Sequence, residues 1–144
     1  FIASSAASDV YKRQAGGGGI PVARDIDGRV RGLEAVVDKD ATSSLLATSL
    51  QADALLLLTD VDGIYRDHGS PDERRVDQIG AQDALRWAED LPQGSIAPKL
   101  RAAASFVAAT GGVAAIGRLN DAESLLAGDS GTRVTPDSGA PDAG

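Results

Sequence analysis

Cysteine and methionine are absent from this 144-residue chain, and histidine and tryptophan occur once each. The absence of cysteine excludes disulfides, thiol catalysis and thiolate metal sites, and a single histidine argues against a histidine-based metal site. Aromatic residues make up only 3% of the sequence, so alanine, valine and leucine must fill the core. Such a core favours helices that pack closely on a sheet through small side chains.

Basic residues are outnumbered, because 14 Lys and Arg face 21 Asp and Glu, which gives a net charge of −7. A nucleic-acid surface needs a basic stripe, so we expect no nucleic-acid partner, although a few local lysines can still hold nucleotide phosphates. No apolar run approaches the roughly 20 residues that a helix needs to cross a bilayer, and no secretory pattern is evident. We therefore expect a cytoplasmic protein without a membrane partner.

Four consecutive leucines at residues 55–58 are the most distinctive apolar feature. A run this short, without a helical cap after it, predicts a strand buried on both faces, as in a parallel sheet, rather than a buried helix segment. The polar loop at 59–63 (TDVDG) follows at once. Because ligands bind at the carboxyl ends of strands in open α/β sheets, we expect a site here.

Strands and helices alternate along the rest of the chain. Asp27-Gly28 predicts the turn of a hairpin within residues 22–37. Helices are expected at 38–51, 81–89, 98–110 and 120–127, and further strands at 113–116 and, along an edge, at 131–134. This order predicts an α/β fold, a three-layer αβα sandwich with a mainly parallel sheet, incomplete at the N-terminus because a first strand is missing.

Local patterns add several expectations. The helix at 38–51 is expected to present one apolar face, formed by Leu45, Leu46, Ser49 and Leu50. Asn120 with Glu123 resembles a capping pair, and residues 65–76 are predicted to form a polar loop. Residues 1–14 are interpreted as a non-native or irregular segment, and residues 135–144 as a disordered tail.

Charged residues open two of the predicted helices, with Lys39 and Asp40 in one and Lys99 in the other. A lysine at a helix N-terminus turns a weak anion site into a phosphate site, and Asp40 would orient such lysines. The non-functional alternatives are a solvated helix start for Lys39 and Asp40 and a surface position for Lys99. Asp60 and Asp62 would then be turn residues. Neither a Walker-type loop nor a G-x-G-x-x-G turn is present.

Four segments occur in one order: residues 15–22 (AGGGGIPV), 34–40 (EAVVDKD), 58–63 (LTDVDG) and 94–99 (GSIAPK). Together they resemble the C-terminal half of carbamate kinase, within the amino-acid kinase superfamily, over residues 15–134. The third and fourth segments are shared across that superfamily, whereas the first two are more specific to carbamate kinase. Without this likeness, the glycine run would be a flexible linker or an anion-binding loop.

The resemblance implies reversible phosphoryl transfer between ATP and carbamate, giving ADP and carbamoyl phosphate. It implies that Lys99 contacts the ATP phosphates, that Lys39 lies on the phosphoryl or carbamate side, and that Asp40 organises both lysines. The residues that it implies for carbamate or its product are Gly16, Gly17, Gly18 and Gly19. Those that it implies for the nucleotide are Thr59, Asp60, Val61, Asp62, Gly63, Tyr65, Gly94 and Ser95.

The resemblance also implies Mg²⁺ bound with the nucleotide, without a protein ligand that can be named. It further implies a homodimer for the complete enzyme and a role in arginine fermentation. Carbamate kinases are much longer than this chain, and their N-terminal half carries a first strand, a phosphate loop and a further lysine. We therefore expect a fragment that is inactive alone, with an unpaired sheet edge. The alternatives are a non-catalytic nucleotide-binding remnant and another member of the superfamily.

Overall fold

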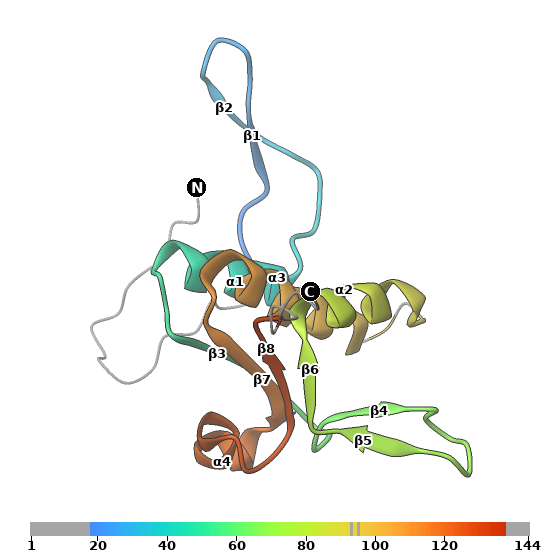
Figure 1. The fold of residues 1–144 in the computed structure, drawn as a ribbon. Coiled ribbons are helices and arrows are strands. Elements are labelled where there is room, and N and C mark those ends of the chain that lie inside the picture. Colours follow the sequence, from blue (N-terminus) through green and yellow to red (C-terminus); the bar gives the residue numbers. More distant parts are fainter. Residues whose placement is uncertain (1–17, 93, 95, 138–144) are drawn as a thin grey trace, which may run out of the picture.

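The computed structural model describes residues 18–92, 94 and 96–137 (Figure 1). The predicted N-terminal segment at 1–14, two glycines of the glycine run (Gly16 and Gly17), Ser95 and residues 138–144 of the predicted tail lie outside the described residues. Among the described helices, none combines the length and hydropathy that a bilayer crossing demands.

A four-stranded sheet forms the centre of the molecule. Its strands lie in the order β3 (Ala54–Thr59), β7 (Val113–Arg118), β8 (Thr132–Thr135) and β6 (Gln78–Gly80). The outer pairs β3–β7 and β6–β8 are parallel, whereas β7 and β8 run antiparallel. The sheet is therefore mixed but mainly parallel, as the sequence predicts.

Strand β8 lies inside the sheet, between β7 and β6, so its prediction as an edge strand is wrong. Its Thr132 and Val134 side chains are fully buried. The burial of β8 comes from its neighbouring strands on both sides and from the helices that pack on it. The four-residue sequence of the strand does not indicate these tertiary neighbours. Strand β6 was not predicted at all, because three residues are too few for a periodicity to show.

The leucine run forms β3, and the predicted strand is confirmed. Leu55 and Leu57 are buried, but Leu56 and Leu58 on the opposite face are only half-buried. The prediction of burial on both faces is therefore only half right. Within the described part of the chain, β3 pairs with β7 alone, which leaves its other side as an unpaired sheet edge.

Helices cover both faces of the sheet (Figure 1). Helix α3 (Ile96–Thr110) packs on the sheet between α1 (Lys39–Ser49) and α2 (Ala81–Asp90), and the short α4 (Ala122–Ala127) covers β3 and β7 on the other face. The most deeply buried large side chains come from α3, α4, β7 and β8: Phe106, Leu100, Val107, Leu125, Ile116 and Val134. The predicted three-layer αβα arrangement is confirmed.

Helix α4 ends as predicted at Gly128, whose φ of +88° suits a residue without a Cβ. Its start differs from the prediction. Asn120 lies in a 3₁₀ turn, η1 (Leu119–Asp121), and the residue before α4, Asp121, makes no side-chain capping bond. The predicted Asn120–Glu123 capping pair is therefore wrong.

The buried face of α1 differs from the predicted one. Leu45 and Leu50 are exposed, and the residues that α1 buries are small or polar: Asp40, Thr42, Ser44 and Ala47. The side chain of Asp38 accepts a hydrogen bond from the Ala41 N–H at 2.8 Å and sets where the helix begins. Packing against α3 then selects the face that carries Asp40, and this tertiary contact overrides the leucine pattern.

Two hairpins extend from this core (Figure 1). The first joins β1 (Val22–Arg24) to β2 (Val30–Gly32) through the predicted Asp27-Gly28 turn, although no strand continues to residue 37. The second joins β4 (Ile64–Arg66) to β5 (Arg74–Val76), where the sequence predicts a polar loop. That prediction fails because two three-residue strands rich in arginine carry no apolar alternation.

Candidate functional site

A buried ion pair joins the first turns of α1 and α3. The Nζ atom of Lys99 donates hydrogen bonds to Asp40 Oδ1 at 3.1 Å and Oδ2 at 3.0 Å. The two side chains are only 8% and 11% exposed, although 59 residues separate them in sequence. The structure therefore brings together two of the three residues that the resemblance implied for catalysis.

Because the pair is buried, it affects both the stability of the fold and the binding of an anion. Each charge would be costly to bury alone, and removal of one partner from such a pair costs about 3–5 kcal/mol. An ammonium group carries three N–H donors, so Lys99 can donate to Asp40 and to a further anion at the same time. The start of α3 adds the positive end of the helix dipole. The arrangement is suited to an anionic ligand.

Lys39, the third of these residues, does not join the pair. It is the first residue of α1 and is exposed. Consecutive residues of a helix point in different directions, so the side chain beside Asp40 in sequence does not share its buried face. Of the two lysines that Asp40 was expected to organise, the described contacts join it to Lys99.

The described end of the glycine run lies close to the start of α1. Gly18 has a φ of +133°, and a Cβ at this position would lie 2.8 Å from the carbonyl oxygen of Val37. A side chain therefore cannot be accommodated, and the backbone of Gly18 passes directly beside Val37, the residue before Asp38. Glycine here allows the close approach of the two segments.

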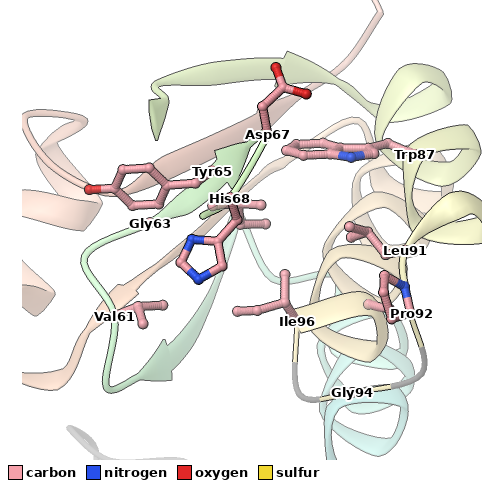
Figure 2. A pocket seen from close by; sticks show the side chains of 12 residues that line it. Val61, Gly63, Tyr65, Asp67, His68, Trp87, Leu91, Pro92, Gly94 and Ile96 are labelled. Carbon is pink, nitrogen blue, oxygen red and sulfur yellow. The ribbon is translucent and has the colours of Figure 1, made fainter. Parts of the chain in front are cut away.

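A cavity of about 490 Å³ opens beside the start of α3 (Figure 2). One wall comes from the β3–β4 loop and the β4–β5 hairpin, and the other from α2, the segment after it and the start of α3. Figure 2 shows Tyr65 and His68 on the first side and Trp87, Leu91 and Ile96 on the second. The walls are mainly apolar, so the cavity suits a flat or apolar part of a ligand.

The cavity and the ion pair are adjacent along α3. Ile96 and Ala97, the first two residues of the helix, line the cavity, and Lys99 follows two residues later. An extended ligand with an apolar group at one end and an anionic group at the other could therefore use both. This geometry is the main structural feature that the site offers.

Four of the eight residues implied for the nucleotide line the cavity: Val61, Gly63, Tyr65 and Gly94. Thr59, Asp60 and Asp62 do not line it, and Ser95 lies outside the described residues. The hydroxyl of Thr59 donates to Asp60 Oδ1 at 3.0 Å, and Asp60 is exposed at the carboxyl end of β3.

Asp62 is engaged within the hairpin. The phenol of Tyr65 donates to its two carboxylate oxygens at 3.1 and 3.2 Å, and Arg75 Nη1 lies 3.6 Å from Asp62 Oδ2. Arg75 also donates from Nε to Asp77 Oδ1 at 2.9 Å. The hydrogen bond to Asp62 raises the pKa of Tyr65 above its usual value, because it favours the protonated phenol. This network braces the wall of the cavity.

Sequence reasoning missed residues on both sides of the cavity. Trp87 lies on α2, where Arg66 from the hairpin stacks over its ring with the guanidinium carbon 4.7 Å from the ring centroid. His68, which the sequence places in a solvated loop, is exposed and also lines the cavity. Its Nδ1 lies 3.2 Å from Glu73 Oε2. Only the tertiary approach of α2 to the hairpin identifies these residues.

The described residues contain no group of three or more His, Cys, Asp or Glu side chains that could hold a metal ion. Among the described residues, Lys99 is a buried positive charge beside the cavity that an anion could use.

Comparisons with known proteins identify relatives of this chain. A profile of the Amino acid kinase family matches residues 7–116. The carbamate kinase of Thermoplasma volcanium is 41% identical over 123 residues, which are 84% of this chain and 40% of that protein. The carbamate kinase of Haemophilus influenzae is 40% identical over 121 residues, which are 84% of this chain and 38% of that protein.

Solved structures show the same likeness. A carbamate kinase from Giardia lamblia bound to AMP-PNP superimposes with a TM-score of 0.76 at 41% identity, over 84% of this chain and 43% of that chain. The chain thus spans about 40% of the length of the curated relatives that it matches. From the family profile and the identity over most of its length, this chain belongs to the amino acid kinase family.

Proposed function

We propose that this chain carries the nucleotide-binding part of a carbamate kinase. In a protein of its relatives' length, it would serve reversible phosphoryl transfer between ATP and carbamate, giving ADP and carbamoyl phosphate. The observation that carries the proposal is the buried Lys99–Asp40 pair at one end of an apolar cavity. Support comes from carbamate kinases at about 40% identity, one of them solved with AMP-PNP.

In this proposal the nucleotide base lies in the cavity between Tyr65 and Ile96, and the phosphates extend past the start of α3. Lys99 contacts the phosphates and stabilises the phosphoryl group as it moves. Asp40 holds the ammonium in place, so no reorganisation is needed when charge develops. A preorganised donor of this kind contributes about 3 kcal/mol to transition-state stabilisation.

The acceptor side is proposed for the glycine run and the start of α1. Backbone amides of residues 16–19 would bind carbamate or carbamoyl phosphate, and the exposed Lys39 would approach from the first residue of α1. The close approach of Gly18 to Val37 supports this placement, because it puts the described end of the glycine run beside that helix start. Carbamate is already an anion and needs no general base, so alignment and charge neutralisation suffice.

Thr59 and Asp60, and Asp62 through the hairpin, are proposed to shape the nucleotide side without lining the cavity itself. Mg²⁺ is proposed only as the ion that accompanies the phosphates of ATP, because no acidic cluster of the described residues is suited to hold it. A homodimer, a cytoplasmic location and a role in arginine metabolism are likewise proposals for the complete protein.

Titration with AMP-PNP tests the nucleotide part of the proposal. The single tryptophan of the chain, Trp87, lines the cavity and provides a fluorescence signal. Lys99→Ala should weaken binding by about tenfold or more, because a hydrogen bond to a charged group contributes about 1.5–3 kcal/mol. Arg29→Ala, on the exposed tip of the β1–β2 hairpin, removes the same charge and should leave binding unchanged. Equal affinity for wild type and Lys99→Ala would remove Lys99 from this role.

Turnover is tested separately, by ATP formed from ADP and carbamoyl phosphate. We expect binding without turnover for this chain alone and turnover for a protein of the relatives' length. Normal turnover by this chain would contradict the proposed need for further segments. Phosphorylation of an amino-acid carboxylate or a nucleoside monophosphate in preference to carbamate by the longer protein would instead favour another member of the family.

A further inference from the structure

We infer that Thr132 is a positioning residue for the cavity, because its buried hydroxyl ties both strands of the β4–β5 hairpin to the central sheet. The inference rests on the proposed function, in which that cavity holds the nucleotide base. Thr132 is the first residue of β8 and does not itself line the cavity, although its hydroxyl bonds to Ile64, which does. It acts through the hairpin that forms one wall.

The Thr132 hydroxyl forms hydrogen bonds with both strands of the hairpin at one cross-strand pair. Thr132 Oγ1 accepts a hydrogen bond from the Ile64 N–H at 2.7 Å and donates one to the Val76 carbonyl at 2.6 Å. Ile64 and Val76 are cross-strand partners at the base of the hairpin. Thr132 is 0% exposed, so water cannot replace either bond. One side chain thus satisfies a donor and an acceptor on two different strands.

The position of the hairpin base sets the position of the cavity wall that the hairpin forms. Beyond the base, the hairpin has two three-residue strands, and an isolated two-stranded hairpin is marginal in water. Tyr65, Asp67 and His68 in the cavity wall follow Ile64 within the next four residues. A rotation at Ile64 would therefore carry the hairpin part of the wall away from α2 and the start of α3.

Close packing around Thr132 leaves little freedom for its hydroxyl. A Cβ on Gly63 would lie 3.1 Å from Thr132 Oγ1 and 2.9 Å from Arg75 Cδ. Gly131, which precedes Thr132, has a φ of +75°, and a Cβ there would lie 2.6 Å from the carbonyl oxygen of Ile116. These two glycines allow the hairpin and the sheet to approach closely enough for the hydroxyl to reach both strands.

A valine at position 132 would keep the shape of the side chain and remove both bonds. The Ile64 N–H and the Val76 carbonyl would then lose their partner, which is costly for buried polar groups. The hairpin can relieve this only by moving towards solvent or to new partners. A serine would keep the hydroxyl and lose one methyl group. The pair of variants therefore separates the hydrogen bonds from the packing.

The test compares AMP-PNP titrations of wild type, Thr132→Val and Thr132→Ser. We expect Thr132→Val to raise the Kd about tenfold, as for the loss of buried hydrogen bonds, and Thr132→Ser to restore most of the affinity. Val134→Ala is the matched control, because Val134 is equally buried on the same strand but bonds to neither hairpin strand through its side chain. It should lower the Tm and leave the Kd unchanged below its Tm.

The outcomes separate the two proposals. If wild type does not bind AMP-PNP, the proposed function fails. If wild type binds and Thr132→Val binds equally well, or Val134→Ala weakens binding as much, the role of Thr132 in positioning is overturned. Trp87 emission without nucleotide provides an independent measurement. It should change in Thr132→Val, because Arg66 on the hairpin stacks over the indole, and should stay the same in Val134→Ala.

A measurement on the unmodified chain covers the case in which Thr132→Val does not fold. Coupling between sites is reciprocal, so a nucleotide that depends on the hairpin must also stabilise its base. Hydrogen exchange of the Ile64 amide should therefore slow when AMP-PNP is bound. Unchanged exchange at Ile64, with binding confirmed, would overturn the inference.

Discussion

The two ends of the candidate site are built in opposite ways. At one end, two helices hold a buried lysine and aspartate in direct contact, with side chains 8% and 11% exposed. At the other end, a two-stranded hairpin and the segment after α2 enclose an apolar cavity of about 490 Å³. The ionic end depends on two charges that need each other, whereas the cavity end depends on many small contacts. Changes at the ionic end should therefore be severe, and changes at the cavity end graded.

The largest expected effect comes from Asp40→Ala, which leaves Lys99 buried without its carboxylate. Urea denaturation should show a loss of about 3–5 kcal/mol in the free energy of unfolding. The double variant Asp40→Leu/Lys99→Met removes both charges and should recover most of this loss, because apolar residues of similar volume can replace a buried pair. It should still bind nucleotide weakly. A double variant as unstable as the single one would show that the pair does not dominate this end.

A moderate effect is expected from Gly63→Ala at the cavity end. The new Cβ would lie 2.9 Å from Arg75 Cδ and 3.1 Å from Thr132 Oγ1, so the Arg75 side chain or the hairpin must shift. We expect a loss of about 1–3 kcal/mol, as for other overpacked positions, measured by urea denaturation. Gly32→Ala is the control, because a Cβ there meets no atom within 4 Å. If both variants are equally stable, the hairpin base is looser than its contacts indicate.

The smallest effect is a titration. In a Tyr11→Phe background, Tyr65 is the one tyrosine of the chain. Its ionisation, followed by absorbance, should have a midpoint above the ordinary value of about 10, because Asp62 accepts a hydrogen bond from the phenol. Asp62→Asn should bring the midpoint back towards that value. An unchanged midpoint would show that the bond to Asp62 is not formed in solution.

The sign of the accompanying stability effect follows from the direction of the shift. A group whose pKa is raised in the folded state contributes stability that is fully present below its unfolded pKa and is lost as the pH rises through the folded value. For Tyr65 this window begins near pH 10, at about the unfolded pKa, and extends above it. At neutral pH this contribution is therefore fully present, and the stability of the hairpin should not change with pH through this group.

The two hairpins show why some elements could be predicted and others could not. The β1–β2 hairpin has a local signal, since Asp27-Gly28 specifies its turn whatever the rest of the chain does. The β4–β5 hairpin has no such signal, because its strands are short and polar and its base depends on Thr132, 56 residues after Val76. A contact over that distance in sequence has no local pattern.

The candidate site divides in the same way. Lys99, Asp40, Tyr65 and Gly63 could be selected from the sequence because they lie in motifs at helix starts and after the leucine strand. Trp87, His68 and Thr132 could not, since each gains its role from a partner on another element. The buried face of α1 was mispredicted for the same reason. Asp40 is buried in place of Leu45 because α3 supplies Lys99 as its partner.

The alternation of β3 and β7 with the main helices, the turn at Asp27-Gly28 and the charged residues at two helix starts were determined by the sequence alone, because periodicity, turn chemistry and motif order act over short distances. Tertiary structure alone decided the central place of β8, the polar face that α1 buries, and the wall that Thr132 holds over the cavity. Burial and hydrogen-bond satisfaction are properties of neighbours in space, and a single chain read in order does not contain them.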